Sequence, residues 1–456
     1  MSDFAELSID GRIATPSDSD WDEVRLGWNL AIDQRPEAVA LVANAEDIAK
    51  TVAFAASHDL RVAGQGTGHG STGLPPLDET ILIKTAAMRG VEIDPDAQTA
   101  RVEAGVLSLE LGEAGQPNGL CGMPGSSPDV GIVGYTLGGG LSWLARKHGF
   151  ACNRVTAIEV VTAAGEQRTV NADDGADLFW ALRGGGGGYA IVTALHIALL
   201  PIAEAYAGAL LFPAAVGADA VRTYRDWAAE APDEVTSVVR FLTPPPIPDV
   251  PEPLRGTPLL TITGACIGTQ EEGEVAFAPL RQIGETLMDT FGWMPTVGLS
   301  RIHMDPENPV PGVGEGGLVK ELTDEAIDAF VGVAGPDSGT PLLLSELRML
   351  GGALGRPAEN AGALSHIDAD YAIYSVGMAM TPEMGDAARA HLKKIGETMK
   401  PWSSEGSYFN FTEAPCDVDA ILPPSVCDRL REVKRAWDPE GRVVANHAVA
   451  SAATRS

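Results

Sequence analysis

Three glycine-rich blocks between residues 61 and 188 constrain this chain more than any other feature. The first, Arg61–Gly73, holds five glycines in thirteen residues and a single histidine, His69. The second is Gly125–Gly140 and the third is Gly184–Gly188. Each block lies beside a strand-like run, and a glycine backbone can approach a phosphate without a Cβ in the way. Because the blocks contain almost no lysine or arginine, we expect backbone amides to hold a phosphate-bearing cofactor there.

The first block formally matches a dinucleotide-binding motif, but the residues after it exclude that site. Gly68-His-Gly-Ser-Thr-Gly73 fits G-x-G-x-x-G, which needs a helix to open within the turn and face the pyrophosphate. Leu74-Pro-Pro-Leu77 follows at once, and its prolines stop such a helix. The chain also lacks the G-x-x-x-x-G-K-[ST], H-E-x-x-H, C-x-x-C and G-x-S-x-G motifs of phosphate loops, zinc sites and serine hydrolases.

The charge of the chain excludes two classes of partner. Its 456 residues carry a net charge of −30, so nucleic acid and an anionic membrane surface would both be repelled. No apolar run reaches the ~20 residues that span a bilayer. The N-terminus lacks the basic and apolar regions of a signal peptide, and the five cysteines show no paired spacing. These features predict a cytoplasmic protein with free thiols.

The residues before the first block have an α/β pattern. Ala38–Val42 is typical of a buried strand, and Asn44 is suited to cap a helix that runs to about His58. The strand Arg61–Ala63 then leads into the first block. Near the N-terminus, Asp20–Asn29 predicts a further helix. Alternating strands and helices followed by a glycine turn favour an α/β lobe.

The second half of the chain has a different pattern. Alternating apolar residues predict strands at 205–212, 235–242 and 258–265. Val275–Thr290 predicts one of the helices between and after these strands. Antiparallel strands mixed with helices favour a second, α+β domain at about residues 206–405.

Several motifs together resemble one family of flavoproteins. Thr67-Gly-His-Gly70, Pro128–Gly140 and Asp177–Thr193 look like glycine-rich segments of the vanillyl-alcohol-oxidase type. More narrowly, they look like its berberine-bridge-enzyme-like branch, with a PCMH-type FAD-binding domain. Tyr408–Phe411 and Val433–Asn446 resemble the ending of that branch. The resemblance covers nearly the whole chain in the right order.

The resemblance implies an α+β fold with α/β-type lobes. The FAD-binding domain would take residues 1–205, in two lobes of about 1–108 and 109–205. The substrate domain, an antiparallel sheet covered by helices, would take residues 206–405. Residues 406–456 would return to the FAD-binding domain.

The resemblance also implies that FAD is linked covalently, through its 8α carbon, to His69. Many members carry a second link from a cysteine just before the Pro-x-Val-Gly segment. Ser127 stands at that position, and neither Cys121 nor Cys152 aligns with it. We therefore expect a single covalent link.

Further FAD contacts are implied for all three regions and the tail. The first block departs from the usual Arg-x-Gly-Gly-His-Ser of the family, because it reads Gln65-Gly-Thr-Gly-His-Gly70. The tail motif ends in Phe411 where the family usually has a tyrosine, so a role that rests on that hydroxyl does not transfer. The implied contacts are Gln65, Gly66, Thr67, Gly68, Gly70, Ser71, Gly125, Ser127, Val130, Gly131, Gly134, Thr136, Gly138, Gly139, Gly140, Ile191, Val192 and Asn446.

The implied reaction transfers a hydride from a substrate carbon to flavin N5, while a base removes a proton from the adjacent O–H or N–H. By motif position the candidate base is Tyr408. Because the pKa of a free phenol is ~10, this tyrosine needs a nearby positive charge. Val130 stands where plant members of the branch use valine to admit oxygen, which indicates an oxidase that makes H2O2.

Three functions stay open at this level. The leading one is an oxidase of a small-molecule alcohol or amine, with O2 as the second substrate and a monomer or homodimer as the working form. The others are a flavin dehydrogenase with another electron acceptor, and a homologue that binds flavin without catalysis. Glu346 and Arg348 share one face of a predicted strand, where they either face the flavin or form an ordinary surface ion pair.

Overall fold

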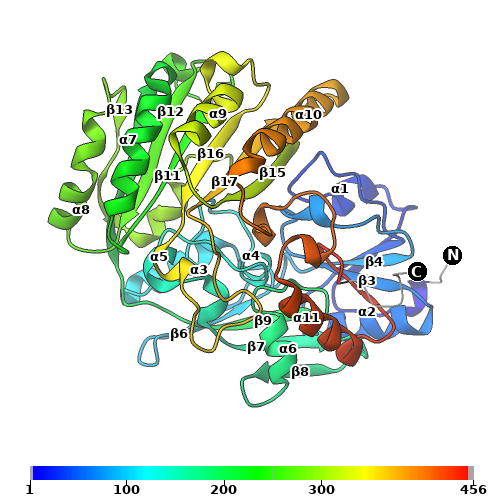
Figure 1. Cartoon of the computed structure of the whole chain (residues 1–456). Helices are drawn as coiled ribbons and strands as arrows, with labels where there is room; N and C mark the ends of the chain where they lie inside the picture. Colours follow the sequence, from blue (N-terminus) through cyan, green and yellow to red (C-terminus); the bar gives the residue numbers. More distant parts are fainter. Residues whose placement is uncertain (1–3, 249, 450–456) are drawn as a thin grey trace.

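The structure is a computed structural model that describes residues 4–248 and 250–449 and contains three sheets (Figure 1). In the first sheet, four strands run parallel and β1 lies antiparallel at one edge. Helix α2 (Ala45–Ser57) packs against this sheet, and the Asn44 side chain accepts a hydrogen bond from the Asp47 amide at 3.0 Å. The predicted N-cap is therefore confirmed. The strands in sheet order are β1 (Arg12–Ala14), β2 (Ala38–Leu41), β4 (Thr80–Lys84), β3 (Arg61–Gln65) and β18 (Val443–Val444).

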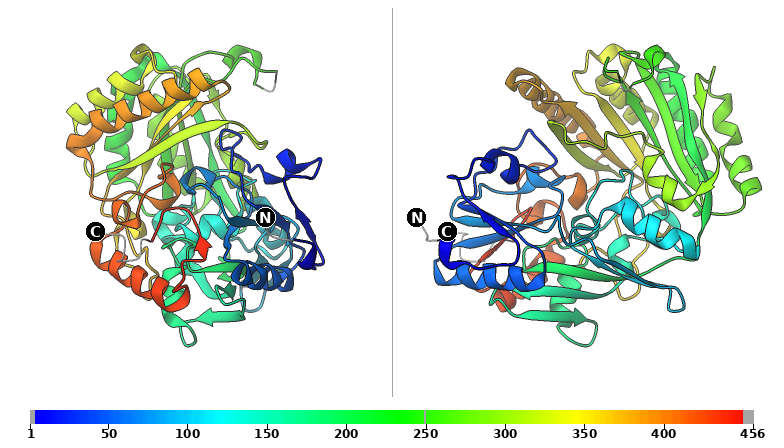
Figure 2. Two further views of the ribbon diagram at one scale, coloured as in Figure 1. Left: turned by 90° about the vertical axis from the view of Figure 1, so that its right-hand side faces the viewer. Right: turned by 180° about the vertical axis from the view of Figure 1, so that it is seen from behind.

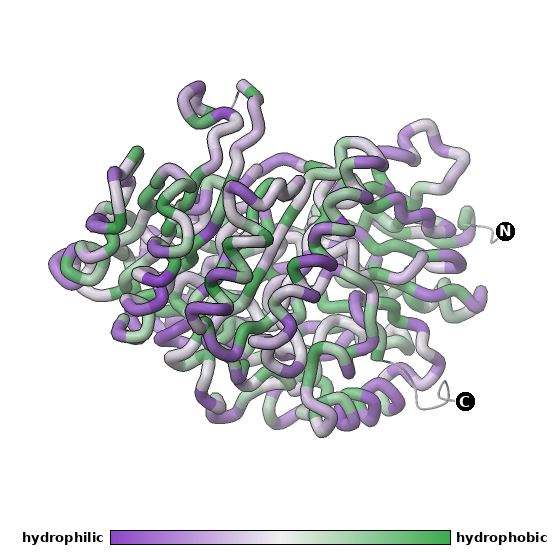
Figure 3. The backbone as a smooth tube through the Cα atoms, turned by 45° about the horizontal axis from the view of Figure 1, so that its top comes forward, coloured by the Kyte–Doolittle hydropathy of each residue, from purple (hydrophilic) through white to green (hydrophobic). Residues whose placement is uncertain are grey.

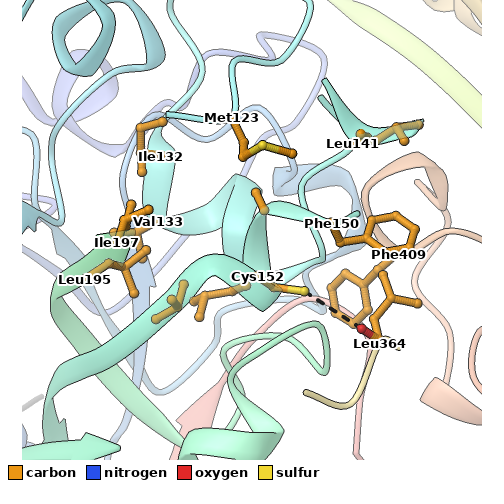
Figure 4. Close-up of a cluster of buried hydrophobic side chains, with 14 of the residues drawn as sticks. Met123, Ile132, Val133, Leu141, Phe150, Cys152, Leu195, Ile197, Leu364 and Phe409 are labelled. Atoms are coloured by element: carbon orange, nitrogen blue, oxygen red, sulfur yellow. Dashed lines mark hydrogen bonds between the residues drawn. The ribbon is translucent and has the colours of Figure 1, made fainter. Parts of the chain in front are cut away.

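The second sheet is antiparallel and lies beside the second glycine block. Part of that block forms helix α4 (Ile132–Leu137). Val133 of this helix packs near Leu195 and Ile197 of the sheet in a cluster of buried hydrophobic side chains (Figure 4). The strands in sheet order are β5 (Val91–Asp94), β6 (Thr99–Glu103), β9 (Ala190–Ala198), β7 (Val155–Thr162) and β8 (Gln167–Asn171), and the other helices of this part are α3 (Ser108–Gly115), α5 (Ala145–His148) and α6 (Ala176–Ala181).

The third sheet has eight strands, and helices cover one of its faces (Figures 1 and 2). Apolar side chains between the sheet and these helices form a separate core, and the other face turns toward the first two sheets. The strands in sheet order are β13 (Met288–Asp289), β10 (Glu204–Pro213), β12 (Leu259–Cys266), β11 (Val235–Leu242), β16 (Leu344–Met349), β17 (Tyr371–Met378) and β15 (Gly312–Val319), with β14 (Gly292–Pro295) also paired to β10; the helices are α7 (Gly217–Glu230), α8 (Gln270–Phe277), α9 (Asp324–Ala334) and α10 (Pro382–Met399).

The C-terminal segment returns to the first two sheets. Helix α11 (Pro424–Trp437) packs on α6, and β18 then adds to β3 in parallel. Lys434 holds this return in place, because its ammonium group donates to the Gly188 carbonyl at 2.6 Å and the Val443 carbonyl at 2.8 Å. The third glycine block and the last strand are thereby joined by one side chain.

Most predicted elements are present, and two predicted helices are wrong in length. The N-terminal helix α1 covers only Trp21–Arg25, and the next residues run extended toward the first block. Helix α8 ends at Phe277, because Pro279 follows in a 3-10 turn, and residues 288–289 form a strand instead of a helical end. The strands predicted at 205–212, 235–242 and 258–265 are confirmed as β10, β11 and β12.

Hydropathy follows this architecture. Green, hydrophobic segments lie mainly along the inner strands and inward helix faces, while purple segments lie on outer turns (Figure 3). Among the described residues, no helix combines the length and apolarity required to cross a membrane. The cysteines at 121, 152, 266, 416 and 427 are all free thiols.

Candidate active site

A cavity of about 460 Å³ lies where the three sheets meet. The first glycine block, α4, the start of β9 and the C-terminal segment form one side of it, and the inner face of the third sheet forms the other. Its walls hold both polar backbone and apolar side chains. The elements that converge here are far apart in sequence, as expected when a return segment closes a pocket between domains.

Most of the residues predicted from the sequence line this cavity together. They come from the end of β3, the following 3-10 turn, the N-terminal side of α4, β9 and the tail. Trp28, Thr72, Tyr135 and Gly186 also line it, and sequence analysis did not assign them to the site. The predicted residues that line the cavity are Gln65, Gly66, Thr67, Gly68, His69, Gly70, Ser71, Gly125, Ser127, Val130, Gly131, Gly134, Gly138, Ile191, Val192, Tyr408 and Asn446.

Three predicted contacts do not line the cavity. Thr136 lies on the buried side of α4, with 3% of its surface exposed. Gly139 (φ +117°) and Gly140 (φ +79°) form the turn after that helix. A Cβ would fall 2.6 Å from Leu364 Cδ2 at Gly139 and 2.5 Å from Ala151 Cβ at Gly140. These two glycines therefore serve the turn and its close packing, and their assignment as cofactor contacts stays a prediction.

His69 is held between an aromatic ring and two polar groups. The Thr67 hydroxyl lies 2.8 Å from Nδ1, and the Trp28 ring stacks on the imidazole at 4.1 Å between centroids. Nε2 is buried, makes no hydrogen bond within the described chain, and lies 3.5 Å from an Asp129 carboxylate oxygen. The carboxylate of Asp129 also accepts a hydrogen bond from the Trp28 indole. One ring nitrogen is thus fixed by a hydrogen bond, and the other makes none, with the Asp129 carboxylate as its nearest polar neighbour.

The cavity holds few cations of its own. Among the described residues its lining includes only two arginines and no lysine. Arg240 pairs with Asp305 at 3.1 Å, and Arg348 pairs with Glu346 at 2.7 Å. Both arginines are already neutralised, so a phosphate on the glycine side would be held by backbone amides, as the sequence indicates.

The third sheet presents a polar row to the cavity. Arg240 on β11 lies directly opposite Glu346 on β16, which lies directly opposite Tyr374 on β17. Arg348 is on the same face two residues further on, and its guanidinium carbon lies 5.2 Å from the Phe411 ring centroid. Glu346 is only 2% exposed and lines the cavity, so the alternative of an ordinary surface ion pair is wrong.

Two tyrosines have contrasting surroundings at this cavity. Tyr408 is 2% exposed, and its hydroxyl accepts a hydrogen bond from the Asn410 amide at 3.2 Å. Burial raises the pKa of Tyr408, and this effect outweighs the lowering that the positive charge of Arg348 causes. Tyr408 therefore lacks the net positive surroundings that a phenolate would need. The hydroxyl of half-buried Tyr374 instead donates to the Glu413 carboxylate. Tyr374 also lines the cavity and was not among the residues predicted for the site.

The residues that line the cavity fit a large cofactor that contacts the backbone of the glycine-lined wall. At one end lies Nε2 of His69, a buried ring nitrogen without a hydrogen bond in the described chain. At Gly70 a Cβ would meet the Asn446 amide nitrogen at 2.8 Å, so this turn has no room for a side chain. No cysteine lines the cavity in the part of the chain that the structure describes, and Ser127 bonds to Asp305 at 3.3 Å.

The chain is similar to known FAD-binding proteins in sequence and in fold. Residues 36–171 match the model of the FAD binding domain. The chain is 27% identical to (R)-6-hydroxynicotine oxidase of Paenarthrobacter nicotinovorans over 97% of both chains. The solved structure of BBE-like 1 from Physcomitrella patens is 18% identical and has a TM-score of 0.83 over 95% of each chain.

A further solved structure is similar in fold. Wild-type Phl p 4.0202, described as a glucose dehydrogenase, is 18% identical with a TM-score of 0.78 over 96% of each chain. An isoleucine-to-valine variant of Phl p 4 is described as a glucose oxidase. Proteins of this fold thus include both oxidases and dehydrogenases.

Proposed function

We infer the reaction from one premise: the chain belongs to the FAD-linked oxidoreductases of the vanillyl-alcohol-oxidase type, in the berberine-bridge-enzyme-like branch. It is an FAD-dependent oxidoreductase. We propose that it is an oxidase that removes a hydride and a proton from a small-molecule alcohol or amine and passes the electrons to O2, giving H2O2. The observation that carries the proposal is one cavity that joins the glycine-lined wall to the polar row of the third sheet.

The residues of the glycine-lined wall would hold FAD. When bound, FAD supplies the two-electron acceptor that no side chain provides. The backbone of Gly66 to Gly70 and of Gly131 would meet its phosphates, and Asn446 would close this edge. His69 would form the covalent bond through Nε2, because Nδ1 is already engaged by Thr67. Ser127 offers no thiolate, so the link would be single.

The covalent link is tested on the denatured protein. After acid precipitation we expect the flavin to stay with the protein, and mass spectrometry of its peptides to place one FAD on His69. NMR of the flavopeptide distinguishes attachment at Nε2 from attachment at Nδ1. Release of all flavin into the acid supernatant contradicts the link, and a flavin-bearing cysteine peptide contradicts its being single.

The reaction class is tested by two readings of the same protein. Under anaerobic conditions, 6-hydroxynicotine, D-glucose and an aromatic alcohol are offered in turn, and bleaching of the flavin reports its reduction. Air is then admitted and peroxide is measured. Bleaching followed by peroxide supports the oxidase, bleaching without peroxide supports a dehydrogenase, and absence of bleaching with a wide panel supports a protein that binds flavin without catalysis.

A further inference from the structure

We propose, on the premise of the proposed function, that Tyr374 and Glu413 form the pair that accepts the substrate proton. Both residues line the cavity and both are half-buried, so they are reachable from it. They come from different parts of the chain: Tyr374 lies on β17, and Glu413 follows the tail motif that ends in Phe411. The tail motif singles out only Tyr408 in this site, whereas Tyr374 and Glu413 lie outside that motif.

The hydrogen bond between the two side chains has a defined direction. The Tyr374 hydroxyl donates to Glu413 Oε1, and Glu413 Oε2 accepts from the Gly314 amide at 3.0 Å. Each carboxylate oxygen of Glu413 is therefore held by a hydrogen bond. A phenol that already donates to a carboxylate can accept a proton from a substrate and release its own in the same step.

Strand β15 leaves the space in which this pair forms. A Cβ on Gly314 would lie 2.5 Å from Glu413 Oε1 and 2.8 Å from the Tyr374 oxygen. A Cβ on Gly316 would lie 2.6 Å from Phe411 Cβ. Neither glycine has a positive φ, so backbone conformation does not demand it. Close approach of the tail to the sheet is therefore the physical reason for both glycines.

Tyr374 lies beside Phe411, the position at which the tail motif lacks its usual tyrosine hydroxyl. The rings of Tyr374 and Phe411 stack at 4.7 Å between centroids and 24° between planes. Phe411 in turn meets Tyr408 edge to face at 4.9 Å. Tyr374 thus brings a phenol hydroxyl next to the ring at which the resembling family usually has a tyrosine.

Tyr408 is the poorer acceptor of the two. Its hydroxyl receives a hydrogen bond from Asn410, and the described chain gives it no carboxylate partner. A proton taken up by Tyr408 has no base to move on to. Tyr374 passes its own proton directly to Glu413.

The charges around the pair favour a neutral phenol and a proton-accepting carboxyl. Desolvation raises the pKa of Glu413, while its hydrogen bonds with Tyr374, the Gly314 amide and Thr72 lower it in part. Desolvation raises the pKa of Tyr374 well above its ordinary value, helped by negative charge from three carboxylates. Those groups are Glu413 on the tail, Glu346 on β16 and Glu315 on β15.

The proposed step balances in protons and electrons. For an alcohol, the C–H bond breaks and its electron pair leaves as hydride to FAD, while the O–H proton moves to the Tyr374 oxygen. The proton of Tyr374 moves to Glu413, and the substrate becomes a carbonyl compound. An amine follows the same scheme with N–H and an imine. No further reactant is needed before the flavin is reoxidised.

The first test measures anaerobic flavin reduction in the holoenzyme by whichever probe bleaches the wild type. We expect Tyr374→Phe and Glu413→Gln each to slow reduction by about 100-fold or more. The double variant should be no slower than the worse single variant, because the two groups act as one unit. In the wild type the rate should rise with pH through the pKa of Glu413, and Glu413→Gln should remove that rise.

Matched controls separate this role from simple damage. Tyr371→Phe removes a hydroxyl from the opposite face of the same strand, and Glu321→Gln neutralises an exposed carboxylate just after the neighbouring strand β15, outside the cavity lining. Both should reduce flavin at close to the wild-type rate. Rates for Tyr374→Phe and Glu413→Gln within threefold of wild type, or a large loss in Tyr408→Phe alone, overturn the proposal.

The second test needs no substrate. Infrared difference spectra across a pH titration follow the Glu413 carboxyl band, which Glu413→Gln identifies by its loss. Tyr374→Phe should raise the pKa of that carboxyl, because a hydrogen bond to its charged form is lost, and Tyr371→Phe should leave it unchanged. An unmoved titration in Tyr374→Phe refutes the pair even if no probe reduces the flavin. A wild type that no probe bleaches counts against the proposed function alone.

Discussion

The indole of Trp28 stacks on the imidazole of His69, with ring centroids 4.1 Å apart and planes at 19°. The two segments are also joined by a backbone hydrogen bond from the Trp28 amide to the Thr67 carbonyl at 2.9 Å. The stack fixes the ring plane of His69, and the Thr67 hydroxyl fixes its rotation. The nitrogen that points away from these contacts is Nε2.

This arrangement predicts that Trp28 assists flavin attachment. An aromatic stack is worth about 0.5–1.5 kcal/mol beyond burial, so Trp28→Ala should leave His69 mobile and lower the fraction of flavin that survives acid precipitation. Trp293→Ala, on the far strand β14 of the third sheet, serves as the control. Equal retention in the two variants contradicts the assignment.

Val130 provides a second prediction. It lines the cavity on the glycine side. Val130→Leu should slow reoxidation of the reduced flavin by air several-fold while leaving its anaerobic reduction nearly unchanged. Stopped-flow mixing with oxygenated buffer measures this, with Val376→Leu on the opposite wall as the comparison. Parallel losses in both half-reactions would instead indicate a packing defect.

The local elements of this fold could be predicted, whereas the partners of the site could not. Asn44 and the run behind it predict α2 correctly, because an N-cap acts over a few residues. Strand β15 was missed, because four of its eight residues are glycines, a composition that disfavours strands. Its glycines are explained only by the tail that packs on them.

In the site, too, residues close together in sequence could be predicted and residues far apart could not. His69 and its glycines are adjacent in sequence, so their pattern predicts a cradle. Tyr374 and Glu413 are 39 residues apart, and the register of β16 against β17 decides that Tyr374 faces the cavity. A one-residue shift of that register would turn Tyr374 to the opposite face, and strand patterns alone do not fix register.

The Glu346–Arg348 pair gives a prediction about stability. Arg348→Met leaves the carboxylate of Glu346, 2% exposed, without its partner, which should cost about 3–5 kcal/mol of unfolding free energy. Combining it with Glu346→Gln should recover much of that loss. Urea denaturation measures both, and Arg356→Met at the exposed Arg356–Asp233 pair should cost less than about 1 kcal/mol.

Lys84 gives a prediction about pH. Its ammonium group donates to the Leu26 carbonyl, and burial lowers its pKa to about 8. The unfolded chain binds this proton up to a pKa of about 10.4, so the unfolded state holds more protons between these values. Unfolding free energy should therefore rise from about pH 8 to about pH 10.4, by up to ~3 kcal/mol. Lys84→Met should flatten that rise, and parallel curves for the two proteins would refute it.

Gly314 tests the geometry of the proposed pair without touching either member. Gly314→Ala would place a methyl group 2.5 Å from Glu413 Oε1, so the carboxylate must move and its bond to Tyr374 must lengthen or break. Gly317→Ala adds the same methyl group to the same strand where no heavy atom lies within 4 Å. We expect Gly314→Ala to lose most of the flavin reduction rate and to shift the Glu413 infrared titration, while Gly317→Ala leaves both unchanged. If the two variants behave alike, close packing on β15 is not what holds Glu413 against Tyr374.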